Sequence, residues 1–133
     1  MADHTIYFIG GEDDESGVLT SLQNGEECTL SLAYRGRHIS ASARDFFEAF
    51  CEIRLQLEPE ALIPFCYGAS LNVYPSGMSR DMSKGLMAYR LVSGSQATRE
   101  SLVRIFEHGH DVIPSSVANQ KAFFAEWLAS LKA

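Results

Sequence analysis

The chain has 133 residues, of which 46% are hydrophobic and 21% are charged, as expected for one globular domain spanning residues 1–133. Its net charge of −6 argues against nucleic acid as a direct partner, because phosphate binding needs a basic surface. The chain has no apolar run of about 18 residues and no basic N-terminal region before an apolar stretch. We therefore expect no membrane association, no signal peptide and a cytoplasmic protein.

The first forty residues predict an antiparallel meander. Runs of β-forming residues are separated by polar or glycine-containing turns, and 12–16 is expected to be a loop. Residues 27–34 alternate between an apolar and a small polar face, which is typical of a half-buried strand. Asn24-Gly25 predicts a type I′ hairpin turn, because both of its central positions need positive φ. The strands are expected over 4–9, 18–22, 27–34 and 37–41.

A first helix is predicted to begin at Ser42. Ser42 and Asp45 have the spacing of a capping box, in which the serine side chain accepts from the third helical N–H. Pro59 is expected to end the helix. The apolar residues recur at helical intervals and predict one stripe that packs against the meander, made by Phe46, Phe47, Phe50, Ile53 and Leu57.

The centre of the chain is apolar but interrupted. Pro64 and Gly68 exclude a long helix over 62–74. Ser76 or Ser79 is expected to cap a short helix that runs to about Leu86. Met78 and Met82 lie one turn apart and are expected to face the core. The alternative is an exposed, adaptable patch for a partner, lined by Tyr67, Tyr74, Met78 and Met82.

The C-terminal third predicts two further strands and a long helix. Residues 88–92 are expected to be a strand, and 102–106 favour a strand over a helix because of Val103 and Ile105. The last helix is predicted to start at 114–116, with Val117, Phe124, Trp127, Leu128 and Leu131 as its apolar stripe. The expected fold class is α+β, with an antiparallel sheet (the N-terminal meander plus later strands) and two longer helices and one short helix packed on it.

Negative charge is concentrated at the N-terminus. The first thirty residues contain seven acids and no Lys or Arg, and the other 103 contain ten acids and all eleven bases. One-sided charge attracts a cationic partner and speeds its encounter, whereas a solvated acidic edge would only keep the protein soluble. The residues expected to contact a partner are Glu12, Asp13, Asp14, Glu15, Glu26 and Glu27.

Residues suited to catalysis or metal binding are few. His108, His110 and Asp111 are ligand types for zinc or iron, but the spacing identifies no further ligand, and a solvated loop explains them as well. Cys66 lacks the surroundings of a nucleophile, and without a C-x-x-C motif the three cysteines are expected to be reduced core thiols. Glu12–Gly17 does not have calcium-loop spacing. We therefore expect no catalytic residue, no metal and no cofactor.

The middle and C-terminal part of the chain, about residues 64 to 131, resembles a family of small bacterial proteins. These are encoded beside Rhs-type polymorphic toxins and are thought to act as immunity proteins. Ser83 departs from the pattern, which has a Met-Gly-x-Gly run where only Gly85 remains here. The similar segments are Phe65-Cys66-Tyr67-Gly68-Ala69, Tyr74-Pro75-Ser76-Gly77-Met78, Met82, Gly85, Ala88-Tyr89, Leu102-Val103, Ile105-Phe106, Asp111-Val112, Gln120, Phe123 and Trp127.

The resemblance implies a binding protein that is not an enzyme. Such a protein binds a cognate toxin domain stoichiometrically and blocks it, without a cofactor. The acidic N-terminal part lies outside the resemblance, where a toxin-specific surface is expected to vary. The alternative is a small metal-binding protein or enzyme centred on His108, His110 and Asp111, and a homo-oligomeric adaptor is a third hypothesis. The sequence does not fix the oligomeric state.

Overall fold

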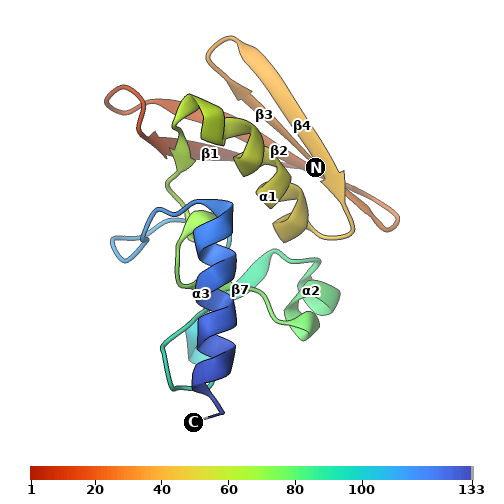
Figure 1. The fold of residues 1–133 in the computed structure, drawn as a ribbon. Helices are drawn as coiled ribbons and strands as arrows, with labels where there is room; N and C mark the ends of the chain where they lie inside the picture. Colours follow the sequence, from red (N-terminus) through yellow and green to blue (C-terminus); the bar gives the residue numbers. More distant parts are fainter. Residues whose placement is uncertain (133) are drawn as a thin grey trace.

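Four consecutive strands form the antiparallel meander in the computed structural model, which describes residues 1–132 (Figure 1). A short fifth strand pairs with β1, so the order across this sheet is β4-β3-β2-β1-β5. The predicted meander is therefore confirmed, and each strand starts or ends within a few residues of its expected bounds. The strands are β1 (Ala2–Ile9), β2 (Ser16–Asn24), β3 (Glu27–Tyr34), β4 (Arg37–Ala43) and β5 (Ile63–Pro64).

The type I′ turn lies in the second hairpin and not in the first. Asn24 pairs with Glu27, so the central residues of the first turn are Gly25 and Glu26, and only Gly25 has positive φ (63°), as in a type II′ turn. In the second hairpin both central residues have positive φ, Arg35 at 50° and Gly36 at 73°. The position of the first hairpin was predicted correctly, and its turn type was wrong.

The N-cap of helix α1 (Phe46–Leu57) lies three residues later than predicted. Asp45 is its N-cap, and the carboxylate accepts the Glu48 N–H at 2.8 Å. Ser42 cannot cap because β4 continues through it: Ser42 pairs with Thr29, and their hydroxyls lie 2.7 Å apart. The predicted apolar stripe is correct, since all five of its residues are buried, and α1 packs mainly on β3 and β4 of the first sheet.

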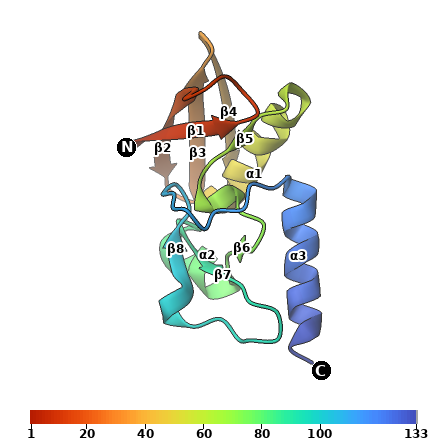
Figure 2. The ribbon, with the colours of Figure 1, turned by 90° about the vertical axis from the view of Figure 1, so that its left-hand side faces the viewer.

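The later strands build a second sheet instead of extending the first, apart from β5. This three-stranded sheet has the order β6-β7-β8 and lies below the meander in Figure 2. The strand predicted over 102–106 is confirmed for its first three residues. The elements are β6 (Val73–Tyr74), α2 (Gly77–Ser83), β7 (Met87–Arg90), β8 (Leu102–Arg104) and α3 (Val117–Ser130). The class is α+β with two longer helices and one short helix, as predicted.

Helix α2 turns its methionines to the solvent, which corrects the expectation that they face the core. Met78 is 68% exposed and Met82 is 81% exposed. The inward positions are taken by Ser79, which completes a capping box with Ser76, and by Arg80. The Arg80 guanidinium lies 5.4 Å from the ring centre of Phe47 and donates to the Asp45 carboxylate at 2.9 Å. In a helix of two turns only one row of side chains can face the core, and in α2 that row is polar.

Near its N-terminus, helix α3 packs on the core through Val117 and Gln120. Gln120 is its only fully buried residue, and Phe124 and Trp127 of the predicted stripe are half-buried. Helix α3 lies beside β6 (Figure 2), and Leu128 of the predicted stripe is 44% exposed. Within residues 1–132, none of the helices combines the length and apolar character needed to cross a bilayer.

Candidate functional site

The six predicted partner-binding acids lie at two opposite ends of the first sheet (Figure 1). The loop between β1 and β2 carries Glu12, Asp13, Asp14 and Glu15, and the hairpin between β2 and β3 carries Glu26 and Glu27. A strand of nine residues separates the two groups. The acids therefore do not form the single anionic face that the sequence suggested.

Two of the six acids are paired with cations. Glu15 accepts from Arg35 at 2.5 and 2.9 Å, and this hydrogen bond holds the pKa of Glu15 below its ordinary value. Glu26 contacts the Lys84 ammonium at 3.1 Å. Within residues 1–132, the carboxylates of Glu12, Asp13, Asp14 and Glu27 have no Lys or Arg nitrogen within 4.0 Å. Three of these four unpaired carboxylates lie together in the β1–β2 loop.

Exposed aromatic and aliphatic side chains lie next to this loop. Tyr7 and Ile9 are 43% and 45% exposed, because β1 alternates and directs Ile6 and Phe8 into the core. Phe65 joins them, since β5 pairs with β1 and the Phe65 N–H donates to the Tyr7 carbonyl at 2.7 Å. A shallow hollow of about 370 Å³ lies among these residues. We call this surface the acidic–aromatic patch: Tyr7, Ile9, Glu12, Asp13, Asp14 and Phe65.

The cluster of His108, His110 and Asp111 does not assemble into a metal site. The Asp111 carboxylate accepts from the Tyr67 hydroxyl at 2.6 Å and from Arg90 at 2.8 Å, and these two hydrogen bonds lower the pKa of Asp111. His108 lies with its ring centre 6.3 Å from Tyr7, at the border of the acidic–aromatic patch. Within residues 1–132 no group of three or more His, Cys, Asp or Glu side chains gathers as metal ligands would.

The cysteines are buried free thiols, in agreement with the sequence prediction. Burial raises the pKa of Cys66 to about 12 and that of Cys51 to about 11. Both thiols are therefore protonated at neutral pH, when a nucleophilic cysteine would need to be a thiolate. Cys66 is a core residue.

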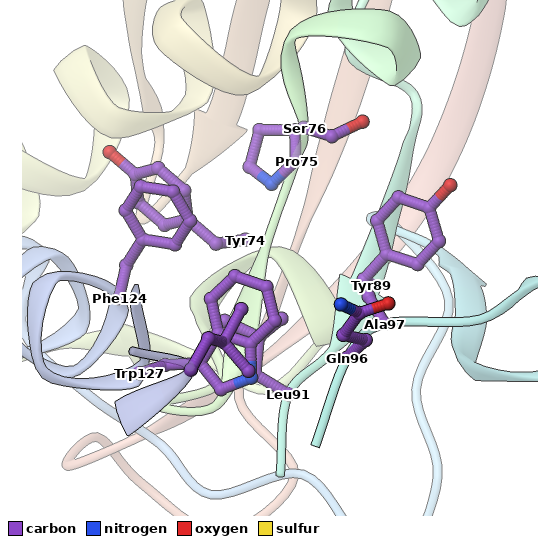
Figure 3. Close-up of a pocket in the computed structure, with 10 residues that line it drawn as sticks. Tyr74, Pro75, Ser76, Tyr89, Leu91, Gln96, Ala97, Phe124 and Trp127 are labelled. Carbon is purple, nitrogen blue, oxygen red and sulfur yellow. The ribbon is translucent and has the colours of Figure 1, made fainter. Parts of the chain in front are cut away.

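A second hollow, which the sequence did not predict as a site, lies between α3 and the second sheet (Figure 3). It encloses about 280 Å³. Tyr74 and Phe124 stack with their ring centres 4.2 Å apart, and Trp127 continues the stack 6.0 Å beyond Phe124. We call it the aromatic pocket: Tyr74, Pro75, Tyr89, Leu91, Gln96, Ala97, Phe124 and Trp127, with Ser76 and Leu131 at its margin. Tyr74, Tyr89 and Trp127 belong to the segments that carry the family resemblance.

Neither the family models nor the curated proteins contain a match to this chain. The resemblance to the family encoded beside Rhs-type toxins thus stays a prediction from the residues quoted above. The acidic–aromatic patch and the aromatic pocket are two surfaces on which exposed or half-buried aromatic side chains line a hollow.

Proposed function

We propose that this protein is a cytoplasmic immunity protein that binds and neutralises a cognate Rhs-type toxin domain by stoichiometric occlusion. The observation that carries the proposal is the acidic–aromatic patch, where Glu12, Asp13 and Asp14 lie unpaired beside exposed Tyr7 and Ile9. The family resemblance supports the same function. The proposed mechanism involves neither a cofactor nor catalytic turnover.

The charges of the patch suit recognition of a basic surface. Within residues 1–132, none of the three loop carboxylates is paired with a cation, whereas Glu15 in the same loop is paired. Stabilisation of the fold by ion pairs therefore does not explain why these three acids are present. Unpaired carboxylates on a protruding loop attract a cationic surface over a Debye length of about 8 Å at physiological salt. Such charges act mainly on the association rate and on the choice of partner.

The apolar members of the patch suit the tight part of the interface. Hot spots of protein interfaces are enriched in tyrosine and lie where water is excluded by surrounding contacts. Tyr7 and Ile9 project from a paired strand, so their positions are fixed before binding. We therefore assign the dissociation rate chiefly to Tyr7, Ile9 and Phe65, and the association rate to Glu12, Asp13 and Asp14.

The primary experiment is co-expression with the C-terminal domain of the toxin encoded beside this protein. Cells are expected to survive, and a complex of the two proteins is expected to elute as one species. Cell death with no complex would overturn the proposal.

A charge-reversal pair locates the interface. Changing Glu12, Asp13 and Asp14 to Lys is expected to slow association about tenfold or more and to weaken its salt dependence. The matched control changes Asp81, Glu100 and Glu126 to Lys, which alters the net charge equally at exposed acids elsewhere. If both triple variants slow association equally, net charge alone would explain the effect, and the patch would not be part of the interface.

The apolar contribution is tested at Tyr7. Tyr7→Ala is expected to raise the dissociation rate, with a loss of about 2 kcal/mol of binding free energy. Val18→Ala is the control, because Val18 is a similarly exposed residue of the neighbouring strand that does not line the hollow. A Tyr7→Ala variant that dissociates no faster than the Val18→Ala variant would contradict the assignment.

A further inference from the structure

We infer that Glu15 and Arg35 are positioning residues of the acidic–aromatic patch. Their ion pair holds the β1–β2 loop in the conformation that presents the three unpaired carboxylates of the patch to a cationic partner. Glu15 itself is not a contact, which differs from the sequence-based expectation that it binds the partner. The inference rests on the proposed function, because it assigns the residues that shape the same site.

Both carboxylate oxygens of Glu15 are used inside the molecule. Oε2 accepts from the Arg35 Nε at 2.5 Å, and Oε1 accepts from the Arg35 Nη2 at 2.9 Å and from the Glu12 N–H at 3.1 Å. A pair with two parallel bonds fixes the orientation of both groups as well as their separation. The Glu15 side chain is only 15% exposed, although it belongs to a loop. Glu15 therefore has little surface to offer a partner.

The backbone of the loop is bonded to the same residue. The Glu15 N–H donates to the Glu12 carbonyl at 3.1 Å, and the Glu15 carbonyl accepts from the Phe8 N–H of β1 at 3.0 Å. Gly11 lies against the Glu15 carboxylate, and a Cβ at Gly11 would overlap Oε1. The segment that carries Asp13 and Asp14 thus lies between two residues that are bonded to each other, and Glu15 connects it to the sheet.

Arg35 connects Glu15 to the β3–β4 hairpin. The two strands of this hairpin are paired from Tyr34–Arg37 to Cys28–Ala43, so the turn that carries Arg35 is held at both ends. Within residues 1–132, Arg35 is the only Lys or Arg with a nitrogen within 4.0 Å of a carboxylate of the β1–β2 loop. Without Arg35, the neighbouring carboxylates of the loop would repel one another with no counter-charge in contact.

A loop that is held before the encounter favours binding. Less conformational entropy is lost when the loop already has its bound conformation. Fixed carboxylates also keep the negative charge beside the exposed side chains of Tyr7 and Ile9, where the proposed contacts form. The ion pair therefore acts on binding through the three unpaired acids and not through a contact of its own.

The direction of a kinetic effect separates positioning from charge. Arg35→Gln makes the net charge of −6 more negative, so electrostatics alone predicts faster association with a basic toxin domain. Loss of positioning predicts association that is about three- to tenfold slower, which stopped-flow mixing measures. Arg37→Gln is the matched control, because it makes the same charge change in the same hairpin and Arg37 pairs with Glu60 outside the loop. The control is expected to associate at least as fast as the unmodified protein. Association of the Arg35→Gln protein as fast as the control would overturn the inference.

Amide hydrogen exchange of the free protein tests the loop without a toxin. Exchange at the Glu12 and Glu15 amides is expected to be about tenfold faster in the Arg35→Gln protein and unchanged in the Arg37→Gln protein. Unchanged exchange in the Arg35→Gln protein would overturn the inference and leave the proposed function standing. Faster exchange, together with no toxin binding by the unmodified protein, would have the opposite meaning: the ion pair holds the loop, and the proposed function is wrong.

Discussion

The Arg54 guanidinium donates to the Gln120 carboxamide oxygen at 2.6 Å, and both side chains are buried although 66 residues separate them in the chain. No carboxylate within residues 1–132 pairs with Arg54, and burial lowers the pKa of this arginine. Arg54 donates to neutral oxygens instead. The Arg54–Gln120 hydrogen bond connects α1 to α3. The two side chains also donate to the backbone carbonyls of Gly68, Ser70, Val73 and Ser115.

Gln120→Leu is expected to be among the most destabilising substitutions in this protein. It removes the acceptor of a buried guanidinium and leaves three carbonyls without the Nε2 donor. We expect a loss of about 3–5 kcal/mol in the free energy of unfolding, measured by urea denaturation. Gln56→Leu is the control, because Gln56 is exposed and donates to Ser40 at 3.1 Å. It should lose less than about 1 kcal/mol. Similar losses for both variants would contradict a special role of the buried pair.

Gly85→Ala tests the contact between α2 and the start of α1. Gly85 has φ of +76°, and a Cβ there would lie 2.8 Å from the Asp45 Oδ1 that caps α1. We expect a loss of about 2–3 kcal/mol from backbone strain and the displaced cap, measured by urea denaturation. Gly94→Ala has a similar φ of +79° but open space around it, so it isolates the backbone contribution of about 1 kcal/mol. Equal losses would exclude the steric contribution.

The buried thiols predict a loss of stability at alkaline pH. The folded pKa is about 11 for Cys51 and about 12 for Cys66, against an ordinary value of 9.0. The folded state therefore holds more protons than the unfolded state above pH 9, and the stability contributed by these thiols is lost as pH rises from 9 towards 12. Urea denaturation between pH 8 and 11 should show this decline, and a Cys51→Ala, Cys66→Ala double variant should show a smaller one. An identical decline in both proteins would assign it to other groups.

The same burial predicts low thiol reactivity. At pH 8 a thiol reagent should modify none of the three cysteines of the folded protein at an appreciable rate, because each is a buried thiol and not a thiolate. All three should react once urea unfolds the chain. Rapid modification of one thiol in the folded protein would contradict the burial described here.

Tyr67→Phe is expected to raise the pKa of Asp111. The hydrogen bond from the Tyr67 hydroxyl is the main cause of the lowered pKa of this carboxyl, and Arg90 is the second. Because the folded pKa lies below 3.8, the stabilising effect of the ionised carboxylate is present above that pH and is lost as pH falls through the folded value. An NMR titration of Asp111 measures the shift. An unchanged pKa in the Tyr67→Phe protein would show that the Tyr67 hydrogen bond is not the main cause of the lowered pKa.

Local rules explain where the sequence predictions succeeded. The alternation over Glu27–Tyr34 placed Cys28, Leu30, Leu32 and Tyr34 in the core, since successive side chains of a strand point to opposite faces. The apolar spacing of α1 identified its buried stripe, because residues three and four positions apart lie on the same face of a helix. The Ser76 cap of α2 was likewise visible, because a capping box is completed within four residues.

Competition with tertiary contacts explains the errors. Ser42 has a residue type and spacing suited to an N-cap, but it pairs with Thr29 and so stays in β4. Asp45 is the N-cap of α1 instead. Met78 and Met82 have core spacing, but Arg80 takes the inward side of α2 because Asp45 and the rings of Phe47 and Tyr74 bind its guanidinium. In both cases the deciding partner lies far away in the chain, or on another element.

The sequence by itself determined the α+β class, the N-terminal meander, the buried stripe of α1 and the concentration of acids before residue 30, because period, turn chemistry and charge are local properties. Only the tertiary structure decided that those acids divide between two ends of a sheet. It also decided that the Asp111 carboxylate accepts hydrogen bonds from Tyr67 and Arg90. Finally, it brought Tyr74, Tyr89 and Trp127 together around one pocket. The reason is that strand register and helix docking bring together residues from separate elements, and no pattern within a single element specifies which side chains will meet.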